Sequence, residues 1–298
     1  MDLSDIELIK TVAHAGSLSE ASKRLNQSQP TLSRKLMRLE DSLKTQLFHR
    51  SPKGLLPTEI AQYIIGAATP LNAHLRSITR YVELASQRDI GSLNVGVGPI
   101  IEQIMLPGVL ERFVATTGDV EVSVVTEDER TLLKMFYASE LDVVIGPIDI
   151  GQNRRKSFVT KSMISDKIVA VANARHPVFG YKTINAGVLE QFSLAVPKTQ
   201  GSIKQSKNAP TLPKPKVVFD NYDILKRLAV ETDLISAGPR AVFKDEIDAK
   251  QLRIINLNLE IFWESALLVR PEVLATPLVK HFVNLCETAA RTVQDKNN

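Results

Sequence analysis

The sequence predicts an α/β protein with a helical N-terminal segment, one long helix, and a C-terminal segment in which strands and helices alternate. Three observations lead to this division. Apolar residues recur at helical spacing up to about residue 56, and they follow steps of three and four from residue 60 to residue 85. Beyond residue 89, short β-branched runs alternate with helical stretches. The 298 residues are enough for two domains with sizeable cores.

The composition is that of a folded globular protein. Apolar residues make up 44% of the chain and charged residues 23%, which excludes a disordered or collagen-like chain. The single cysteine, Cys286, allows no intrachain disulfide and no cysteine-based zinc cluster, and we expect its thiol in the core. Because no apolar run reaches the roughly 18 residues that cross a bilayer and no export signal is recognisable, we expect a cytoplasmic protein with no membrane partner.

Positive charge is concentrated in the N-terminal segment. The net charge is +4, yet residues 23–53 alone contain eight basic and two acidic side chains. Beyond residue 88 the two signs balance, with 25 side chains of each. Charge of one sign gathered in one segment indicates a surface that binds a polyanion.

Two S-x-x-E capping boxes mark helix starts in this segment. In such a box the hydroxyl and the carboxylate accept hydrogen bonds from N–H groups that have no partner inside the helix. Ser4 with Glu7, and Ser17 with Glu20, therefore predict two helices that begin just after each serine.

The second and third helices have helix-turn-helix geometry. Residues 18–25 and 29–43 are separated by three residues, Asn-Gln-Ser, and Pro30 suits the first turn of the third helix. If the leucine stripe of that helix faces the core, Gln29 and Arg34 lie on other faces, where they could bond adenine and guanine. A basic helix alone more often marks a solvated face, but the tight break and the basic hairpin that follows favour DNA binding. The stripe comprises Leu32, Leu36, Leu39 and Leu43.

A hairpin and a long helix follow. Residues 48–56 indicate two extended segments around a turn at 51–54, where a proline and a glycine suit the turn. Thr58 is the expected N-cap of a helix that reaches about residue 85. Pro70 lies inside this helix and predicts a bend rather than an end.

Eight short runs beyond the long helix are candidate strands. Their alternation with helical stretches predicts an α/β domain with a largely parallel sheet. The segment 201–216, with three prolines and no aromatic residue, is loop-like. The candidate strands are residues 93–97, 120–126, 141–145, 167–172, 192–196, 216–219, 234–236 and 266–269.

Several motifs occur together in a fixed order along the chain. The N-terminal ones are ASKRLNQSQPTLSRKLMRLEDSL, LFHR and LLPTEIA, and the later ones are LNVGVG, ELDVVIGP and IVAVANARHP. With these motifs the chain resembles the LysR-type transcriptional regulators along its whole length. The N-terminal motif is the specific one, and the later matches are looser.

The resemblance implies three domains. Residues 1–58 would form a winged helix-turn-helix domain, residues 59–88 a linker helix that pairs with its counterpart in a second subunit, and residues 89–298 an effector-binding domain. Without the resemblance, the apolar stripe of the long helix is equally well explained by packing within its own domain. The effector-binding domain would be a periplasmic-binding-protein-like pair of α/β subdomains, formed by about 89–163 with 268–298, and by about 164–267.

DNA-binding residues follow from the resemblance where the motif matches. In the family, the helix that opens with Ser-Gln-Pro enters the major groove, and the wing lies against the minor groove or phosphate. Lys53 stands where arginine is common, and its point charge suits a phosphate better than specific insertion into a groove. The predicted DNA-binding residues are Ser28, Gln29, Pro30, Thr31, Ser33, Arg34, Arg38, Arg50 and Lys53.

The effector is expected in the crevice between the two subdomains, which agrees with the rule that open α/β sheets bind ligands outside the carboxyl ends of their strands. Ile100 stands where the family often carries Ser or Thr, which favours an apolar or aromatic ligand, or none. The segment 201–219 is shorter and richer in proline than the helix usually found there. The predicted effector-binding residues are Gly98, Pro99, Ile100, Thr126, Glu127, Pro147, Ile148, Ser202, Asn221 and Tyr222.

The remaining motifs do not indicate catalysis. The VGVGP turn at residues 95–99 follows a strand, but the third glycine of a dinucleotide-binding loop is missing and the proline lacks an N–H donor. The five histidines have no metal-binding spacing, and neither a GxSxG nucleophile motif nor paired catalytic carboxylates occur. We therefore expect no metal and no cofactor.

The implied function is that of a sequence-specific DNA-binding transcriptional regulator that responds to a small-molecule effector. Its partners would be double-stranded DNA, the effector, RNA polymerase, and further copies of the chain in a homodimer or a dimer of dimers. One alternative is an α/β enzyme that uses a nucleotide and has an N-terminal helical assembly domain. Another is the solute-binding module of a transporter, which would need an export signal.

Overall fold

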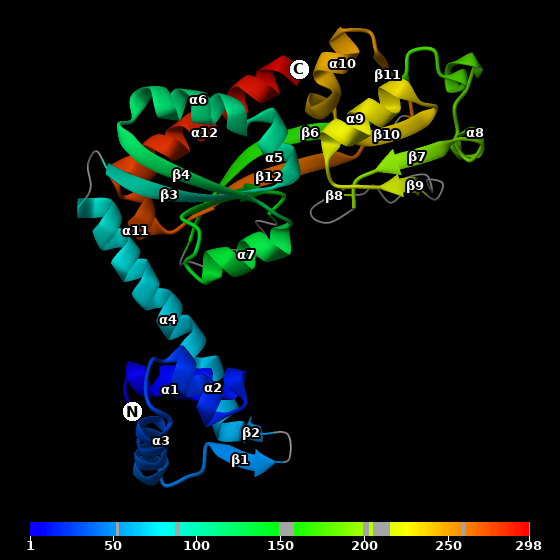
Figure 1. The fold of residues 1–298 in the computed structure, drawn as a ribbon. Coiled ribbons are helices and arrows are strands. Elements are labelled where there is room, and N and C mark those ends of the chain that lie inside the picture. The colour runs from blue at the N-terminus through cyan, green and yellow to red at the C-terminus, as the bar shows by residue number, and fades with distance from the viewer. Residues whose placement is uncertain are drawn as a thin grey trace. The chain divides into compact units, whose positions relative to one another are not determined.

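The computed structural model of the chain divides into two compact units, Met1–Arg76 and Ser77–Asn298. The boundary lies inside the long helix α4 (Glu59–Ser86), so the last turns of this helix belong to the second unit (Figure 1). Of the linker predicted at residues 59–88, residues 59–86 form one continuous helix, and residues 87 and 88 lie outside the described residues. The structure describes residues 1–51, 54–86, 90–148, 158–198, 203–204, 215–257 and 260–297.

The first unit combines helices with a two-stranded hairpin, as the sequence predicts. Its core draws on the first three helices, the hairpin and the start of α4, and Ile9, Val12, Leu32 and Leu47 are almost completely buried in it. The leucine stripe of the third helix therefore faces this core. The elements before α4 are α1 (Leu3–Ala15), α2 (Leu18–Arg24), α3 (Gln29–Leu43), β1 (Phe48–Ser51) and β2 (Gly54–Pro57).

Helix α1 begins two residues earlier than predicted. The Asp2 carboxylate accepts the Asp5 N–H at 3.0 Å, and the Asp5 carboxylate accepts the Asp2 N–H at 2.9 Å. The capping box is therefore Asp2 with Asp5, and Ser4 lies inside the first turn, where its hydroxyl donates to Asp2. The prediction of a Ser4–Glu7 box is wrong because a capping aspartate precedes that serine and satisfies the free N–H groups first.

The other predicted helix starts are confirmed. Ser17 accepts the Glu20 N–H at 3.2 Å, although the Glu20 carboxylate pairs with Lys23 at 2.7 Å instead of completing the box. Thr58 accepts the Ala61 N–H at 3.2 Å at the start of α4. Helix α4 then runs through Pro70 without ending.

The second unit alternates strands and helices, and all eight candidate strands are present. The strand at the predicted run 167–172 is longer and covers 15 residues. Its first half, VTKSMISD, is mostly polar and forms no apolar run, so the sequence pattern marked only the second half. Two further strands were not predicted: one at 252–255, and a two-residue strand at 203–204 inside the segment expected to be loop-like. The elements after α4 are β3 (Ile90–Val97), α5 (Pro99–Ile104), α6 (Leu106–Thr116), β4 (Asp119–Thr126), α7 (Glu129–Tyr137), β5 (Val143–Gly146), β6 (Val159–Asn173), η1 (Pro177–Gly180), α8 (Ala186–Leu189), β7 (Ser193–Val196), β8 (Ile203–Lys204), β9 (Pro215–Val218), α9 (Tyr222–Glu231), β10 (Leu234–Pro239), η2 (Arg240–Phe243), α10 (Lys244–Asp248), β11 (Leu252–Ile255), β12 (Phe262–Val269), α11 (Pro271–Leu274) and α12 (Pro277–Asn297).

The strands of this unit form one mixed sheet in the order β4-β3-β5-β12-β6-β10-β7-β9. The groups β4-β3-β5 and β10-β7-β9 are each parallel. In contrast, β12 is antiparallel to both β5 and β6, and β10 is antiparallel to β6. The prediction of a largely parallel sheet is therefore wrong at the centre, where β6 leaves one subdomain and β12 returns to it in the opposite direction.

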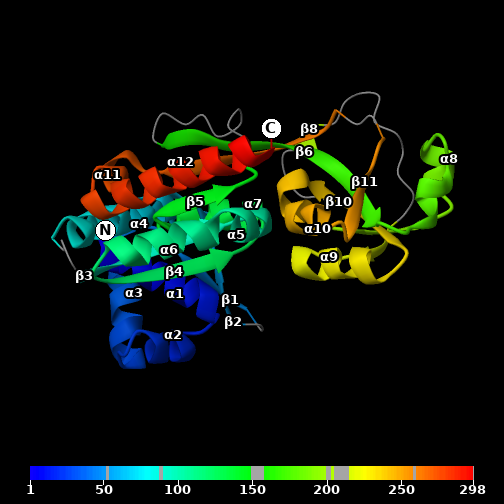
Figure 2. The ribbon, with the colours of Figure 1, turned by 90° about the horizontal axis from the view of Figure 1, so that it is seen from above.

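Helices cover both faces of β4-β3-β5, with α6 and α12 on one side and α7 on the other (Figure 1), and Figure 2 looks down on the side of α6 and α12. Successive residues of β5 point to opposite faces: Val143 and Ile145 join the core under α6 and α12, whereas Val144 joins the one under α7. Cys286 of α12 is fully buried in the first of these cores, as expected, and burial raises the pKa of its thiol. Across the described ranges, no helix combines the length and apolar character needed to span a bilayer.

Candidate functional site

The predicted DNA-binding residues of α3 lie on its outer faces. Ser28 caps the helix by accepting the Thr31 N–H at 3.3 Å, and the two hydroxyls are 2.7 Å apart. With Leu32 and Leu36 buried beneath, the first two turns offer polar side chains to a ligand. The exposed residues are Ser28, Gln29, Pro30, Thr31, Arg34 and Arg38, and Ser33 is half-buried.

The break between α2 and α3 is a tight turn. Asn26 adopts the left-handed region with φ 50°, which asparagine tolerates better than most residues. The Gln27 N–H then donates to the Ser22 carbonyl at 3.0 Å. Asn26 thus allows the chain to turn between α2 and α3, a role that its residue type in the break is consistent with but does not by itself predict.

The hairpin packs against the turn between α1 and α2. Gly54 has φ 112°, and a Cβ there would lie 2.4 Å from the Gly16 carbonyl oxygen, so the position requires glycine. The Leu55 N–H donates to the same oxygen at 2.7 Å. Arg50 lies on β1 opposite Leu55, whereas Lys53 lies outside the described residues.

Glu40 connects α3 to the hairpin, and the sequence analysis missed it. Its Oε1 accepts the N–H groups of Leu47 and Phe48, at 2.7 and 3.3 Å. Both of these residues are buried, so their N–H groups have little access to water. The contact joins residues seven and eight positions apart, a separation that no helix or hairpin repeat marks in the sequence.

The structure brings together the predicted effector residues at the ends of β3, β4 and β5. The Gly98 N–H donates to the Ile145 carbonyl at 2.9 Å, and the Glu127 N–H donates to the Val97 carbonyl at 3.1 Å. A Cβ on Gly98 would lie 3.1 Å from Pro147 Cδ. We call this group the effector edge, which comprises Gly98, Pro99, Thr126, Glu127 and Pro147.

The other predicted effector residues differ in accessibility. Ile100 contacts the core of β3 and also that of α9, so it lies between the two subdomains. Asn221 is exposed and caps α9 by accepting the Ile224 N–H at 3.2 Å. Tyr222 is buried against Phe243, and burial raises the pKa of its hydroxyl.

The last two of the predicted residues, Ile148 and Ser202, present no described side chain to a ligand. Ile148 is 4% exposed and packs in the core under α7. Ser202 lies outside the described residues, as does much of the segment 201–219 around β8 and β9.

Two cavities of the second unit are lined by other residues. One, of about 930 Å³, lies along β6 and β11 and includes Asp166 and Arg240. Burial raises the pKa of the Asp166 carboxyl, which accepts the Ala241 N–H at 2.7 Å. The other, of about 380 Å³, lies between α5, α9 and α12 and includes Gln103. Neither cavity is lined by a predicted effector-binding residue.

The glycines of the VGVGP turn serve packing. A Cβ on Gly96 would lie 2.6 Å from Leu141 Cδ1 and 2.7 Å from Leu132 Cδ2, so glycine lets these leucines lie close against β3. This packing accounts for the motif without a phosphate ligand. Within the described ranges, no group of three or more His, Cys, Asp or Glu side chains is arranged to hold a metal ion.

Two family models cover most of the chain. Residues 3–62 match the bacterial regulatory helix-turn-helix protein model of the lysR family, and residues 86–291 match the LysR substrate binding domain. The chain belongs to the LysR-type transcriptional regulators. This LysR-type regulator combines a DNA-binding helix-turn-helix domain with an effector-binding α/β domain, and it is not an enzyme. The alternative of a nucleotide-using enzyme is therefore wrong.

Individual proteins resemble this LysR-type regulator over most of its length. It is 25% identical over 260 residues to the SDS degradation transcriptional activation protein of Pseudomonas sp. (strain ATCC 19151), covering 86% of this chain and 85% of that one. Its fold is similar to full-length LysG from Corynebacterium glutamicum with bound effector arginine, at 14% identity and a TM-score of 0.61, covering 98% and 99% of the two chains. It is also similar to the Vibrio cholerae virulence activator AphB, at 18% identity and a TM-score of 0.57, covering 96% and 98%.

Proposed function

We propose that this regulator reads duplex DNA in the cytoplasm with the first turns of α3 in the major groove and the hairpin wing against the adjacent minor groove. The observation that carries the proposal is the outward polar face of α3 over a buried leucine stripe. The local excess of basic side chains in residues 23–53 supplies attraction to phosphate. The contact residues are the predicted set of Ser28, Gln29, Pro30, Thr31, Ser33, Arg34, Arg38, Arg50 and Lys53.

Arg34→Ala is expected to weaken specific DNA binding by about 1–3 kcal/mol, because a bidentate contact to a base would be lost. Arg227→Ala is the matched control, since it removes an exposed arginine on α9 that pairs with Glu231. Gel-shift titration with the specific duplex and with random duplexes measures both variants. An equal loss on the two kinds of DNA would assign Arg34 to a phosphate, and no loss at all would remove it from the interface.

Glu40→Ala is expected to loosen the wing while α3 stays folded. The buried N–H groups of Leu47 and Phe48 would lose their acceptor, at a cost of about 1–3 kcal/mol for each group left unpaired. Glu40→Gln keeps an acceptor oxygen and is the matched control. In hydroxyl-radical footprinting on a site selected from random DNA, the alanine variant loses minor-groove protection and the glutamine variant keeps it. Full minor-groove protection by the alanine variant would show that Glu40 does not hold the wing for binding.

We also propose that the chain acts as a homodimer, or as a dimer of dimers, through α4. Several members of its predicted apolar stripe remain exposed, with Ile60 at 46%, Ile78 at 50% and Val82 at 57%. Tyr63 on the same helix is 77% exposed. A regular apolar stripe at helical spacing is rarely left to solvent, and a second copy of α4 offers a matching surface.

The proposed effector site is the crevice next to the effector edge. Parallel strands that end together, followed by a loop or a helix, form the usual ligand position of an α/β sheet. Ile100, between the subdomains, makes the site more apolar than a serine or threonine would. An apolar or aromatic ligand is therefore favoured over a small carboxylate.

Regulation would follow from differential binding of the effector to two arrangements of the subunits. A ligand that prefers one arrangement shifts the population toward it. The spacing or angle of the paired DNA-binding domains would then change, and with it the access of RNA polymerase to the promoter.

A further inference from the structure

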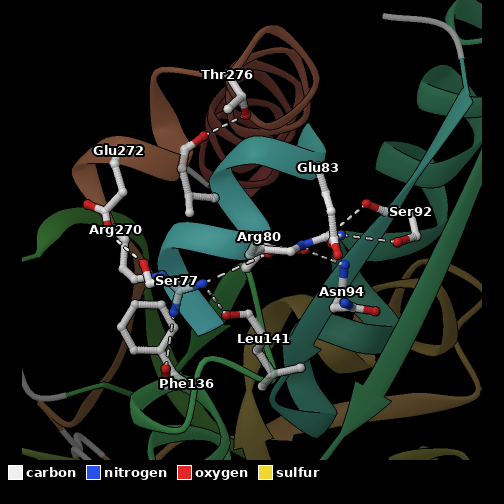
Figure 3. Close-up of polar contacts among 12 residues, drawn as sticks. Ser77, Arg80, Glu83, Ser92, Asn94, Phe136, Leu141, Arg270, Glu272 and Thr276 are labelled. Carbon is white, nitrogen blue, oxygen red and sulfur yellow. Dashed lines mark hydrogen bonds and ion pairs between the residues drawn. The ribbon is translucent and has the colours of Figure 1, made fainter. Parts of the chain in front are cut away.

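The last turns of α4 are attached to the second unit by a cluster of polar contacts (Figure 3). Leu84 is 3% exposed and packs in the core of that unit. The Ser77 hydroxyl donates to the Glu272 carboxylate at 2.7 Å. Arg80, between them on the helix, points toward β3 and the residue that precedes β5.

Arg80 binds a buried carboxylate through two N–H groups on one edge of its guanidinium group. Its Nε and Nη2 donate to the two oxygens of Asp142 at 2.8 and 2.6 Å. Its Nη1 donates to Ser92 Oγ at 3.2 Å, and its Nη2 also donates to the Ser92 carbonyl. The Asp142 side chain is 2% exposed and accepts the Asn94 N–H at 2.8 Å. Lysine has a single point charge and cannot reproduce this two-oxygen contact.

Arg270 connects the same carboxylate to the end of α7. Its guanidinium donates to the carbonyls of Phe136 and Leu141 at 3.1 and 3.0 Å. Its Nη2 lies 3.9 Å from Asp142 Oδ1, and the residue is 5% exposed. The half-buried Arg80 and the buried Arg270 thus share one carboxylate, so the position of Asp142 depends on α4, on α7 and on the end of β12.

The elements that hold this cluster also carry the effector edge at their other ends. β3 extends from the region of Ser92 to Gly98, about 20 Å away at the usual rise of a strand. β5 follows Asp142 and leads to Pro147, and α7 starts after Glu127 and ends at the carbonyl that Arg270 binds. Because strands and helices are stiff over such lengths, these three elements offer a physical route by which a displacement at the effector edge could reach Asp142.

We propose that Arg80 is the positioning residue that passes a displacement of the effector edge to helix α4. The inference rests on the proposed function in one respect, namely that the effector binds at this edge. Arg80 belongs to neither the DNA-binding nor the effector-binding set and acts through Asp142. Because α4 is one helix from residue 59 to residue 86, a change in the orientation of its last turns reaches the part that belongs to the first unit.

A double-variant cycle in the full-length protein tests this inference, with amide hydrogen exchange in residues 77–86 as the readout. Gly98→Ala supplies a small displacement, because the added Cβ would lie 3.1 Å from Pro147 Cδ. Arg80→Lys keeps the charge and removes the fork. Arg227→Lys on α9 is the control, because it makes the same substitution at an exposed ion pair.

Two further variants keep the experiment decisive. We call the side chain added at Gly98 the wedge. Gly98→Val adds a larger wedge, to be used if Gly98→Ala leaves amide hydrogen exchange next to residue 98 unchanged. Asp142→Asn replaces Arg80→Lys if the lysine variant does not fold, because it removes the charge of the carboxylate while keeping its shape.

Arg80→Lys is expected to speed exchange in residues 77–86 about tenfold or more, and Arg227→Lys to leave it unchanged. The wedge at Gly98 is expected to change exchange in residues 77–86 about 2- to 30-fold with Arg80 present, and less than about twofold in the Arg80→Lys background. A purely structural role of Arg80 would alter exchange but would not abolish the effect of the wedge.

Three results would overturn the proposal: unaltered exchange in Arg80→Lys, a wedge effect of equal size in both backgrounds, or no wedge effect with Arg80 present. None of these measurements requires DNA or an effector. A protein that bound no DNA would refute the proposed function and leave the outcome of this cycle standing.

Discussion

Asp142→Ala lowers the free energy of unfolding of the second unit by about 3–5 kcal/mol, because it leaves the buried guanidinium group of Arg270 and the half-buried one of Arg80 without their shared carboxylate. Denaturant unfolding of the full-length protein measures the loss. Glu260→Ala is the control, since Glu260 pairs with Lys167 at the surface, where an ion pair contributes about 0–1 kcal/mol. A loss in Asp142→Ala no larger than that of the control would mean that solvent or a rearranged side chain replaces the carboxylate.

Ile78→Asp is expected to convert the proposed dimer to monomers and to raise the dissociation constant for DNA at least about 100-fold. A two-fold interface through α4 would bury the new charge twice without a partner, at a cost of several kcal/mol. Gln62→Asp adds the same charge to α4 away from the stripe and is expected to leave the dimer intact. Sedimentation measures the oligomeric state of both variants and so shows which face of α4 forms the interface. A less stable chain with an unchanged oligomeric state would show that the stripe packs within its own subunit.

Most of the first unit follows from local sequence signals. Ser17 and Thr58 cap their helices because each hydroxyl needs a partner only three residues away, which a reader of the sequence can see. The Ser4 prediction was wrong for a local reason as well, since Asp2 precedes it and competes for the same N–H groups.

The centre of the large sheet was less predictable. The first half of β6 does not form an apolar run, and its antiparallel pairing with β12 joins residues about 100 positions apart, such as Ser165 and Glu264. Strand direction at such a crossing depends on how the chain leaves and re-enters a subdomain. The local pattern of apolar residues does not contain that information.

In the candidate site, too, local features could be predicted from the sequence and tertiary contacts could not. The outer face of α3 is predictable, because the stripe of Leu32 and Leu36 leaves one helical face for the core and the others for a ligand. The contacts of Glu40 with the hairpin and of Arg80 with Asp142 are tertiary, the latter across 62 positions. Single charged residues of this kind look like ordinary surface residues until the fold brings their partners together.

Hydroxyl-radical footprinting of the full-length protein on the DNA next to its own gene tests the central claim most directly, namely that paired α3 helices and wings read duplex DNA. The predicted result is two protected half-sites related by a two-fold axis and spaced by about 10 base pairs or a multiple of it. Each half-site has backbone and minor-groove protection from the radical, and its major-groove guanine N7 atoms are protected in a parallel dimethyl sulfate reaction. Arg34→Ala is expected to weaken both half-sites at the same base position. Protection no stronger than on random DNA, or a single protected stretch without two-fold symmetry, would contradict this account.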